Sequence, residues 1–134
     1  MIPKEQTDKV IEILKTRIAP VFAYFVEDAP GEHTSPPLLE IPYFAGLEAD
    51  EYRLCELEDE LAGLLGMDVS LIELGQCDPI VAGELLAEGR LVYCQNSPAH
   101  VEFLHSIAKE FEAEGLRRRM LIDRLEHCAS IFEQ

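Results

Sequence analysis

Apolar residues recur along this chain with two different periods, and each change of period marks a predicted element. Helical spacing predicts helices over 5–18 and 50–65, a short helix that closes at Gly89, and a helix whose apolar face runs from Val101 to Phe111. Short β-rich or alternating runs predict strands over 21–26, 38–44, 69–74 and 90–94. Pro42 indicates that 38–44 is an edge strand or contains a bulge. The order predicts one α/β domain over 1–114 and a helical extension over 115–134.

Punctuating residues support these bounds. Asp78 followed by Pro79 is typical of a cap and first turn, and Ser97 followed by Pro98 repeats that signal. Gly66 fits the left-handed residue that ends a helix, and Gly115 is expected to weaken or break the last one.

Composition narrows the function classes. The chain has 134 residues, of which 48% are hydrophobic, which suits one domain with a sizeable core. The formal net charge of −15 disfavours general nucleic-acid binding, although 117–119 is a run of three arginines that forms either a solvated face or a partner contact. The absence of a membrane-length apolar run and the charged N-terminus predict a cytoplasmic protein without a membrane anchor.

Several residue types that often form sites are expected to be structural here. The four cysteines lack zinc-site spacing and are interpreted as reduced thiols, three of them packing as small hydrophobes. The histidines are expected to be exposed or capping residues: His33, His100, His105 and His127. Tyr43 and Tyr93 are predicted to pack in strands. A solvated helix face is predicted for Glu56, Glu58, Asp59 and Glu60.

Two segments carry a family resemblance. The first is FVEDAPGE at 25–32 with LLEI at 38–41, and the second is DVSLIEL at 68–74 followed by EGRLVY at 88–93. Together they resemble the minimal nucleotidyltransferase (MNT) family of the DNA polymerase β superfamily. The resemblance covers about 11–111 and implies a small mixed β-sheet with packed helices, the polymerase β-like nucleotidyltransferase fold.

The family's chemistry requires groups that this chain largely lacks. Members hold two Mg²⁺ ions and a nucleoside triphosphate with an Asp-x-Asp pair, a third Asp and a Gly-Ser turn. Ungapped placement puts the metal positions on Leu38, Glu40 and Ser70. It puts the remnant of the nucleotide-binding loop on Val26, Glu27 and Gly31. Only Glu40 keeps a carboxylate among the metal positions, so no catalytic residue, metal or nucleotide cofactor is expected.

The resemblance also implies a partner. MNT proteins often serve as antitoxins paired with HEPN-domain toxins, which are all-helical ribonucleases. A member without the acids is expected to neutralise its toxin by occupying a surface, and an acidic protein suits a partner that binds RNA through a basic groove. One alternative is an active nucleotidyltransferase that uses Glu40 with Asp68 or Glu73, Mg²⁺ and a nucleoside triphosphate. Another is an oligomeric structural protein with no partner.

The predicted extension is rich in large apolar residues. We expect it to contact either a second copy of the chain or a partner, mainly through Leu116, Met120, Leu121, Leu125 and Phe132. The alternative is that it folds back and covers the sheet.

Overall fold

The predicted order of helices and strands is confirmed. The computed structural model describes residues 2–27, 37–46, 50–114, 123 and 125–128. Most bounds differ from the predicted ones by no more than one residue. The elements are α1 (Lys4–Arg17), β1 (Phe22–Glu27), β2 (Leu38–Phe44), α2 (Glu51–Leu65), β3 (Asp68–Glu73), the 3-10 turn η1 (Leu74–Gln76), α3 (Pro79–Glu88), β4 (Arg90–Cys94) and α4 (Ser97–Glu114).

The four strands form one mixed sheet in the order β3-β2-β1-β4. β1 runs antiparallel to both β2 and β4, whereas β2 and β3 are parallel. A parallel pair needs a crossover connection, and α2 supplies it. The topology therefore places the start of β2 and the start of β3 beside the end of β1.

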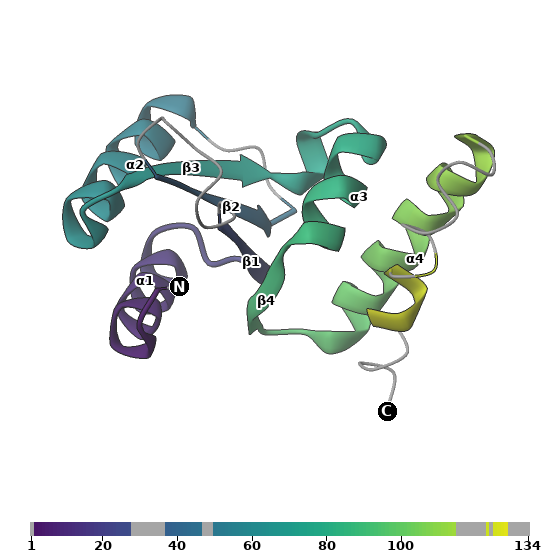
Figure 1. The fold of residues 1–134 in the computed structure, drawn as a ribbon, viewed down its shortest axis with the longest axis horizontal. Helices are drawn as coiled ribbons and strands as arrows, with labels where there is room; N and C mark the ends of the chain where they lie inside the picture. Colours follow the sequence, from purple (N-terminus) through teal and green to yellow (C-terminus); the bar gives the residue numbers. More distant parts are fainter. Residues whose placement is uncertain (1, 28–36, 47–49, 115–122, 124, 129–134) are drawn as a thin grey trace.

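Helices cover both faces of the sheet (Figure 1). Inward-facing residues of α1 and α2, such as Val10 and Leu57, pack with Phe25 and Ile41 on one face. The second core cluster joins alternate residues of β1 to α3 and α4: Phe22, Tyr24, Val26, Leu86, Leu104 and Phe111 among others. Alternation along each strand thus decides which helical layer a side chain meets.

Pro42 was expected to mark an edge strand or a bulge, and the edge alternative is wrong. β2 lies between β3 and β1, and Pro42 is buried. The β1–β2 register pairs Ala23 with Tyr43 and then Val26 with Glu40, with no pair recorded at Pro42 itself. A proline has no N–H to donate, so an inner strand tolerates it here by interrupting the ladder locally.

Of the two side-chain caps that the sequence predicts, Asp78 is confirmed and Ser97 is not, while Asp50 caps a helix in which it was expected to lie. Asp50 accepts a hydrogen bond from Tyr52 N, and Asp78 accepts one from Ile80 N. Gly66 ends α2 with a φ of 68°, a backbone conformation that favours glycine. At α4 the capping side chain is Asn96, which accepts from Ala99 N, and not the expected Ser97. The helix already includes Ser97 as its first residue, so the capping position lies one residue earlier.

Little of the predicted extension lies within the described residues. Position 123 and residues 125–128 are helical, and Leu125 is 1% exposed in the cluster shared with α3 and α4. Gly115 and the arginines at 117–119 lie outside the described residues. Among the helices that the structure describes, none is both long and apolar enough to cross a membrane.

Candidate functional site

Four of the six positions singled out by the family resemblance meet in one row across three strands. In the antiparallel β1–β2 register Val26 lies opposite Glu40, and in the parallel β2–β3 register Glu40 lies beside Ser70. Two residues earlier on the same two strands, Leu38 lies beside Asp68. Residues paired laterally in a sheet point to the same face, so these five side chains share one. We call them the strand-end row.

The strand-end row faces the side of the sheet that carries α3 and α4. Leu38, Glu40 and Ser70 are partly buried and Asp68 is exposed. Val26 is 8% exposed and belongs to the core cluster of that side. A Cβ on Gly89 would lie 3.0 Å from the Val26 Cγ2 atom. Val26 thus packs in the core close to the Gly89 backbone, at the position where the resemblance implies a glycine.

Glu27, beside this row, is held in an ion pair. Its Oε1 atom lies 3.0 Å from Nη2 of Arg90 at the start of β4, and it also accepts a hydrogen bond of 3.5 Å from Ile2 N. The Arg90 guanidinium in turn lies over the Phe25 ring, 5.4 Å from its centroid. Glu27 thus joins the end of β1 to β4 and the N-terminal segment, where the resemblance implies a serine beside the triphosphate.

The two acids that the active alternative adds to Glu40 are placed very differently. Asp68 shares the face of Glu40, one step away on the neighbouring strand. Glu73 lies at the far end of β3, beside Tyr43, and its carboxylate accepts from Ala45 N and Gly75 N. Burial, followed by the charges of Glu73 and Glu58, raises the pKa of Tyr43 to about 12. The structure separates Glu73 from the strand-end row.

The carboxylates present do not match the set that a magnesium-bound triphosphate needs. The row contains Glu40 and Asp68, while Leu38 and Ser70 supply no charge. Within the part of the chain that the structure describes, no group of three or more His, Cys, Asp or Glu side chains could hold a metal ion. Gly31, the third loop position, lies outside the described residues.

No protein-family model matches the chain, and a search of curated proteins finds no significant match. Solved structures do match. A toxin–antitoxin MntA-HepT crystal structure superposes with a TM-score of 0.70 at 19% identity, over 90% of this chain and 97% of that one. An MNT antitoxin in complex with a tri-AMPylated HEPN toxin of Shewanella oneidensis gives 0.69 at 19%, over 90% and 95%. A toxin–antitoxin structure with AMP-PNP gives 0.69 at 19%, over 87% and 95%.

The chain has the MNT nucleotidyltransferase fold. The fold that the resemblance implies is thereby confirmed. Four members of the strand-end row come from an ungapped placement of short segments, Asp68 comes from the active alternative, and the five form a contiguous set in this MNT fold.

One buried polar residue of this MNT fold was missed from the sequence. His100 was expected to be exposed or capping, but it is fully buried on α4. Its Nε2 atom is 2.6 Å from the Tyr24 hydroxyl, and the Phe22 ring packs edge-on at 4.7 Å between centroids. His100 precedes Leu104 by four positions, so the apolar stripe of α4 carried the signal. Burial raises the pKa of Tyr24 and lowers the pKa of His100 to about 4.

The burial of His100 predicts a pH dependence of stability. A folded pKa of about 4 lies below the ordinary value of 6.5, so the unfolded chain binds this proton more readily. The contribution of the neutral, buried His100 to the free energy of unfolding is therefore fully present above pH 6.5. It is lost as the pH falls toward 4, at up to about 1.4 kcal/mol per pH unit. We expect the free energy of unfolding, measured by urea titration at a series of pH values, to fall less steeply between pH 6.5 and pH 4 in His100→Gln than in the wild type. His105→Gln, on the exposed side of α4, is the control; equal slopes in all three proteins would refute the prediction.

The remaining predicted residues are placed mostly as expected. Tyr43 and Tyr93 pack against the α1–α2 side of the sheet. All four cysteines are free, and burial raises the pKa of Cys77. Glu58 departs from the predicted solvated face, because its carboxylate accepts a 2.7 Å hydrogen bond from Leu71 N on the edge strand β3. Among the histidines, His105 and His127 are exposed, and His33 lies outside the described residues.

Of the five proposed partner-contact residues, the structure describes only Leu125. Its side chain is in the chain's own core, against the expectation that it faces a partner. The described helical residues 125–128 place this leucine in the cluster that α3 and α4 share. The other four lie outside the described residues: Leu116, Met120, Leu121 and Phe132.

Proposed function

We propose that this chain is an antitoxin-like protein that neutralises a HEPN-type toxin by binding it, without transferring a nucleotide. The observation that carries the proposal is the strand-end row. Its members are adjacent in the sheet, as a nucleotidyltransferase centre requires, yet Leu38 and Ser70 stand at two of the three metal positions. A leucine cannot ligate Mg²⁺, and a branched valine, Val26, stands where the resemblance implies the glycine of the phosphate-binding turn.

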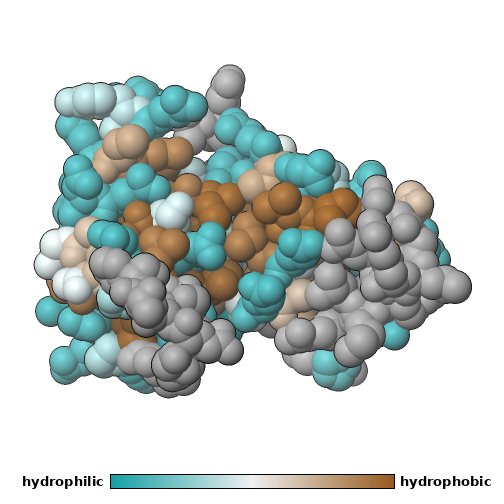
Figure 2. Space-filling model, turned by 45° about the horizontal axis from the view of Figure 1, so that its top comes forward, coloured by the Kyte–Doolittle hydropathy of each residue, from teal (hydrophilic) through white to brown (hydrophobic). Residues whose placement is uncertain are grey.

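Charge and surface character support a binding role. The net charge of −15 favours association with a basic protein surface, such as the RNA-binding groove of a ribonuclease. Figure 2 shows hydrophobic side chains gathered in a band across the middle of one face, with single hydrophilic residues set into it. Apolar patches rimmed by polar residues are typical of protein–protein contacts. Among the similar solved structures, one is the toxin–antitoxin pair MntA-HepT and another is an MNT antitoxin in complex with a HEPN toxin.

A second function has one specific observation in its favour. Glu40 and Asp68 lie on the same face, one step apart on adjacent strands, so two carboxylates remain near the metal position. The toxin in the Shewanella oneidensis complex carries AMP groups, so the reaction to test for this chain is nucleotidyl transfer to a partner. This alternative assigns Glu40 and Asp68 as the ligands of a weak divalent-metal site and drops Glu73.

The proposal is tested by co-expressing the chain with a HEPN-type protein. That protein is a helical protein encoded by the adjacent reading frame and carrying an Arg-x4-6-His motif. We expect the chain to restore growth that the helical protein arrests and to form a stable complex with it. The Glu40→Gln variant is expected to neutralise as well as Glu56→Gln, a matched charge change on the exposed side of α2. The intact mass of the partner is expected to be unmodified. An added nucleotidyl group, or loss of neutralisation in Glu40→Gln alone, would establish the active alternative.

A further inference from the structure

β3 and β4 are the two outer strands of the sheet that the structure describes. β4 has an irregular register with β1 between Ala23 and Tyr24, and such irregularities are one way in which proteins keep an edge strand from pairing with another chain. Within the described residues β3 pairs only with β2, in an unbroken parallel register. We call the side of Asp68–Glu73 that faces away from β2 the β3 edge. Its regular backbone requires another form of protection.

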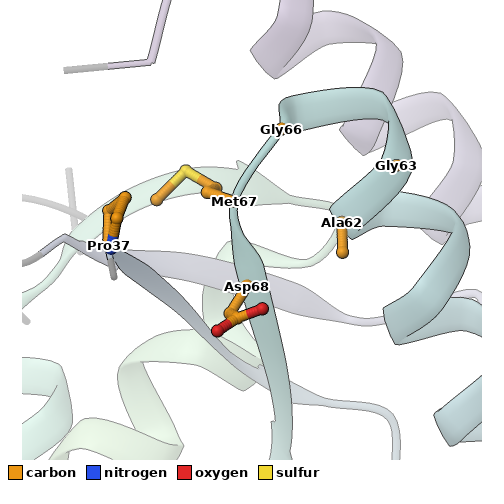
Figure 3. Close-up of a pocket in the computed structure, with 6 residues that line it drawn as sticks. All are labelled: Pro37, Ala62, Gly63, Gly66, Met67 and Asp68. Carbon is orange, nitrogen blue, oxygen red and sulfur yellow. The ribbon is translucent and has the colours of Figure 1, made fainter. Parts of the chain in front are cut away.

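Backbone groups of β3 point alternately toward β2 and away from it. Asp68 N donates to Pro37 O, so this N–H points inward; Figure 3 shows the two residues at the starts of neighbouring strands. Leu71 N, three positions later, donates instead to the Glu58 Oε2 atom at 2.7 Å. By the same alternation Val69 N also points outward. The β3 edge therefore presents two outward N–H groups, and a carboxylate of α2 occupies the second.

Glu58 reaches the β3 edge from α2. Its neighbour Leu57 is 1% exposed in the α1–α2 core cluster, and Glu58 itself is partly buried. A carboxylate oxygen accepts from a strand N–H as the carbonyl of a neighbouring strand would, and a charged acceptor makes the stronger hydrogen bond. A charge at a sheet edge also opposes pairing with a copy that carries the same charge. Glu58 therefore stands where the next strand would bind.

We propose that the β3 edge is a pairing surface for the β3 edge of a second copy of this chain, and that Glu58 holds it closed. Unpaired N–H and C=O groups of an edge strand are satisfied by another strand, so the occupant is an extended segment. A second copy supplies an identical edge, and a two-fold axis makes the contacts the same on both sides. The inference goes beyond the proposed function and does not depend on it.

β3 is self-complementary in one antiparallel register. With a two-fold axis at Ser70, the outward groups of Val69 exchange two hydrogen bonds with those of Leu71 in the second copy. Asp68 then lies opposite Ile72, so no two acids of β3 face each other across the axis. Pairing in this register requires the Leu71 N–H, which is the group that the α2 carboxylate occupies.

Two substitutions at position 58 separate the hydrogen-bond acceptor from its charge. Glu58→Ala removes the acceptor and is expected to strengthen self-association at least about ten-fold over the wild type, because a Leu71 N–H is freed in each copy. Glu58→Gln keeps an acceptor oxygen and is expected to remain closer to the wild type than to Glu58→Ala. Asp59→Ala removes an equal charge from the exposed side of α2 and is the control. Sedimentation equilibrium measures association, and circular dichroism confirms that each variant is folded.

Hydrogen exchange of the Leu71 amide reports the closed edge directly. In dilute Glu58→Ala we expect this amide to exchange at least about ten-fold faster than in the wild type, because it has lost its acceptor. Its protection is expected to return as the protein concentration rises and the second copy supplies a carbonyl. The inward Ser70 amide, on the β2 side, is expected to exchange at the same rate in both proteins, which separates loss of the contact from local unfolding.

A disulfide tests the register. Ser70→Cys is added to Glu58→Ala together with Cys55→Ser, which removes an exposed native thiol. Directly opposed residues at the axis have Cα atoms about 4.5 Å apart, which a disulfide can span. We expect glutathione disulfide to oxidise this variant to a covalent dimer, and Ile72→Cys in the same background, away from the axis, to give much less.

Three results would overturn the assignment. They are unchanged association in Glu58→Ala, equal association in Glu58→Ala and in either Glu58→Gln or Asp59→Ala, and equal cross-linking from positions 70 and 72. The HEPN-type protein takes no part in these measurements, so their failure would leave the proposed function standing, and failure of neutralisation would leave the β3 edge to be decided here.

Discussion

Replacing Gly83 by alanine is expected to lower the free energy of unfolding by about 3 kcal/mol. Gly83 lies on α3, where the Phe111 ring of α4 packs directly on the helix backbone. A Cβ at Gly83 would come within 1.7 Å of the Phe111 Cε2 atom. Phe111 is fully buried, so its ring has no free space to move into without displacing its neighbours. The gain in helix propensity, about 1 kcal/mol, does not offset this overlap.

Gly63→Ala is the matched control, because a Cβ there meets nothing within 4 Å and should stabilise α2 by a few tenths to about 1 kcal/mol. Urea-induced unfolding followed by circular dichroism measures both variants. Adding Phe111→Leu to Gly83→Ala is expected to recover part of the loss, and the double-mutant cycle isolates the contact. If the two glycine variants had the same stability, the close packing of α3 against α4 would be wrong.

The second large effect is a gain of metal binding in the strand-end row. Combining Leu38→Asp with Ser70→Asp would place three carboxylates around one point, namely the two introduced groups and that of Glu40. Asp68 lies alongside them. Without metal, the like charges are expected to cost about 1–2 kcal/mol of stability. Mg²⁺ is expected to raise the melting temperature of this variant and to leave that of the wild type unchanged.

The neutral variant Leu38→Asn with Ser70→Asn separates charge from packing. It is expected to lose the leucine contact and to show no response to Mg²⁺. Thermal unfolding with and without the metal measures all three proteins. An equal Mg²⁺ response in the wild type would show that the placement of the metal positions on β2 is mistaken, and an equal response in the neutral variant would show that the carboxylates are not the ligands.

Local pattern and capping residues predicted the elements well, because they depend on neighbours in the sequence. β2 and β4 have the predicted bounds, and Asp78 with Gly66 mark helix ends as expected. Pro42 was misjudged because strand order depends on the crossover through α2, which no single strand encodes. His100 was misjudged for a similar reason, since its hydrogen-bond partner lies 76 positions away on β1.

The candidate site was predictable in its members and not in its surroundings. An ungapped placement selected Val26, Glu40 and Ser70, and strand register brings them together. The Glu27–Arg90 pair could not be foreseen, because it depends on which strand flanks β1. Glu58 was also misread, because only the folded edge of β3 supplies the N–H that it accepts.

The central claim is that the strand-end row binds no magnesium-bound nucleotide, and isothermal titration calorimetry of the purified full chain tests it most directly. Mg²⁺-ATP and Mg²⁺-GTP are titrated to millimolar concentration into the wild type, into Glu40→Ala and into Glu56→Ala as the control. The residues of the row predict no saturable heat in any of the three proteins. Saturable binding to the wild type and to Glu56→Ala that is lost in Glu40→Ala would contradict the claim and establish an active nucleotidyltransferase site.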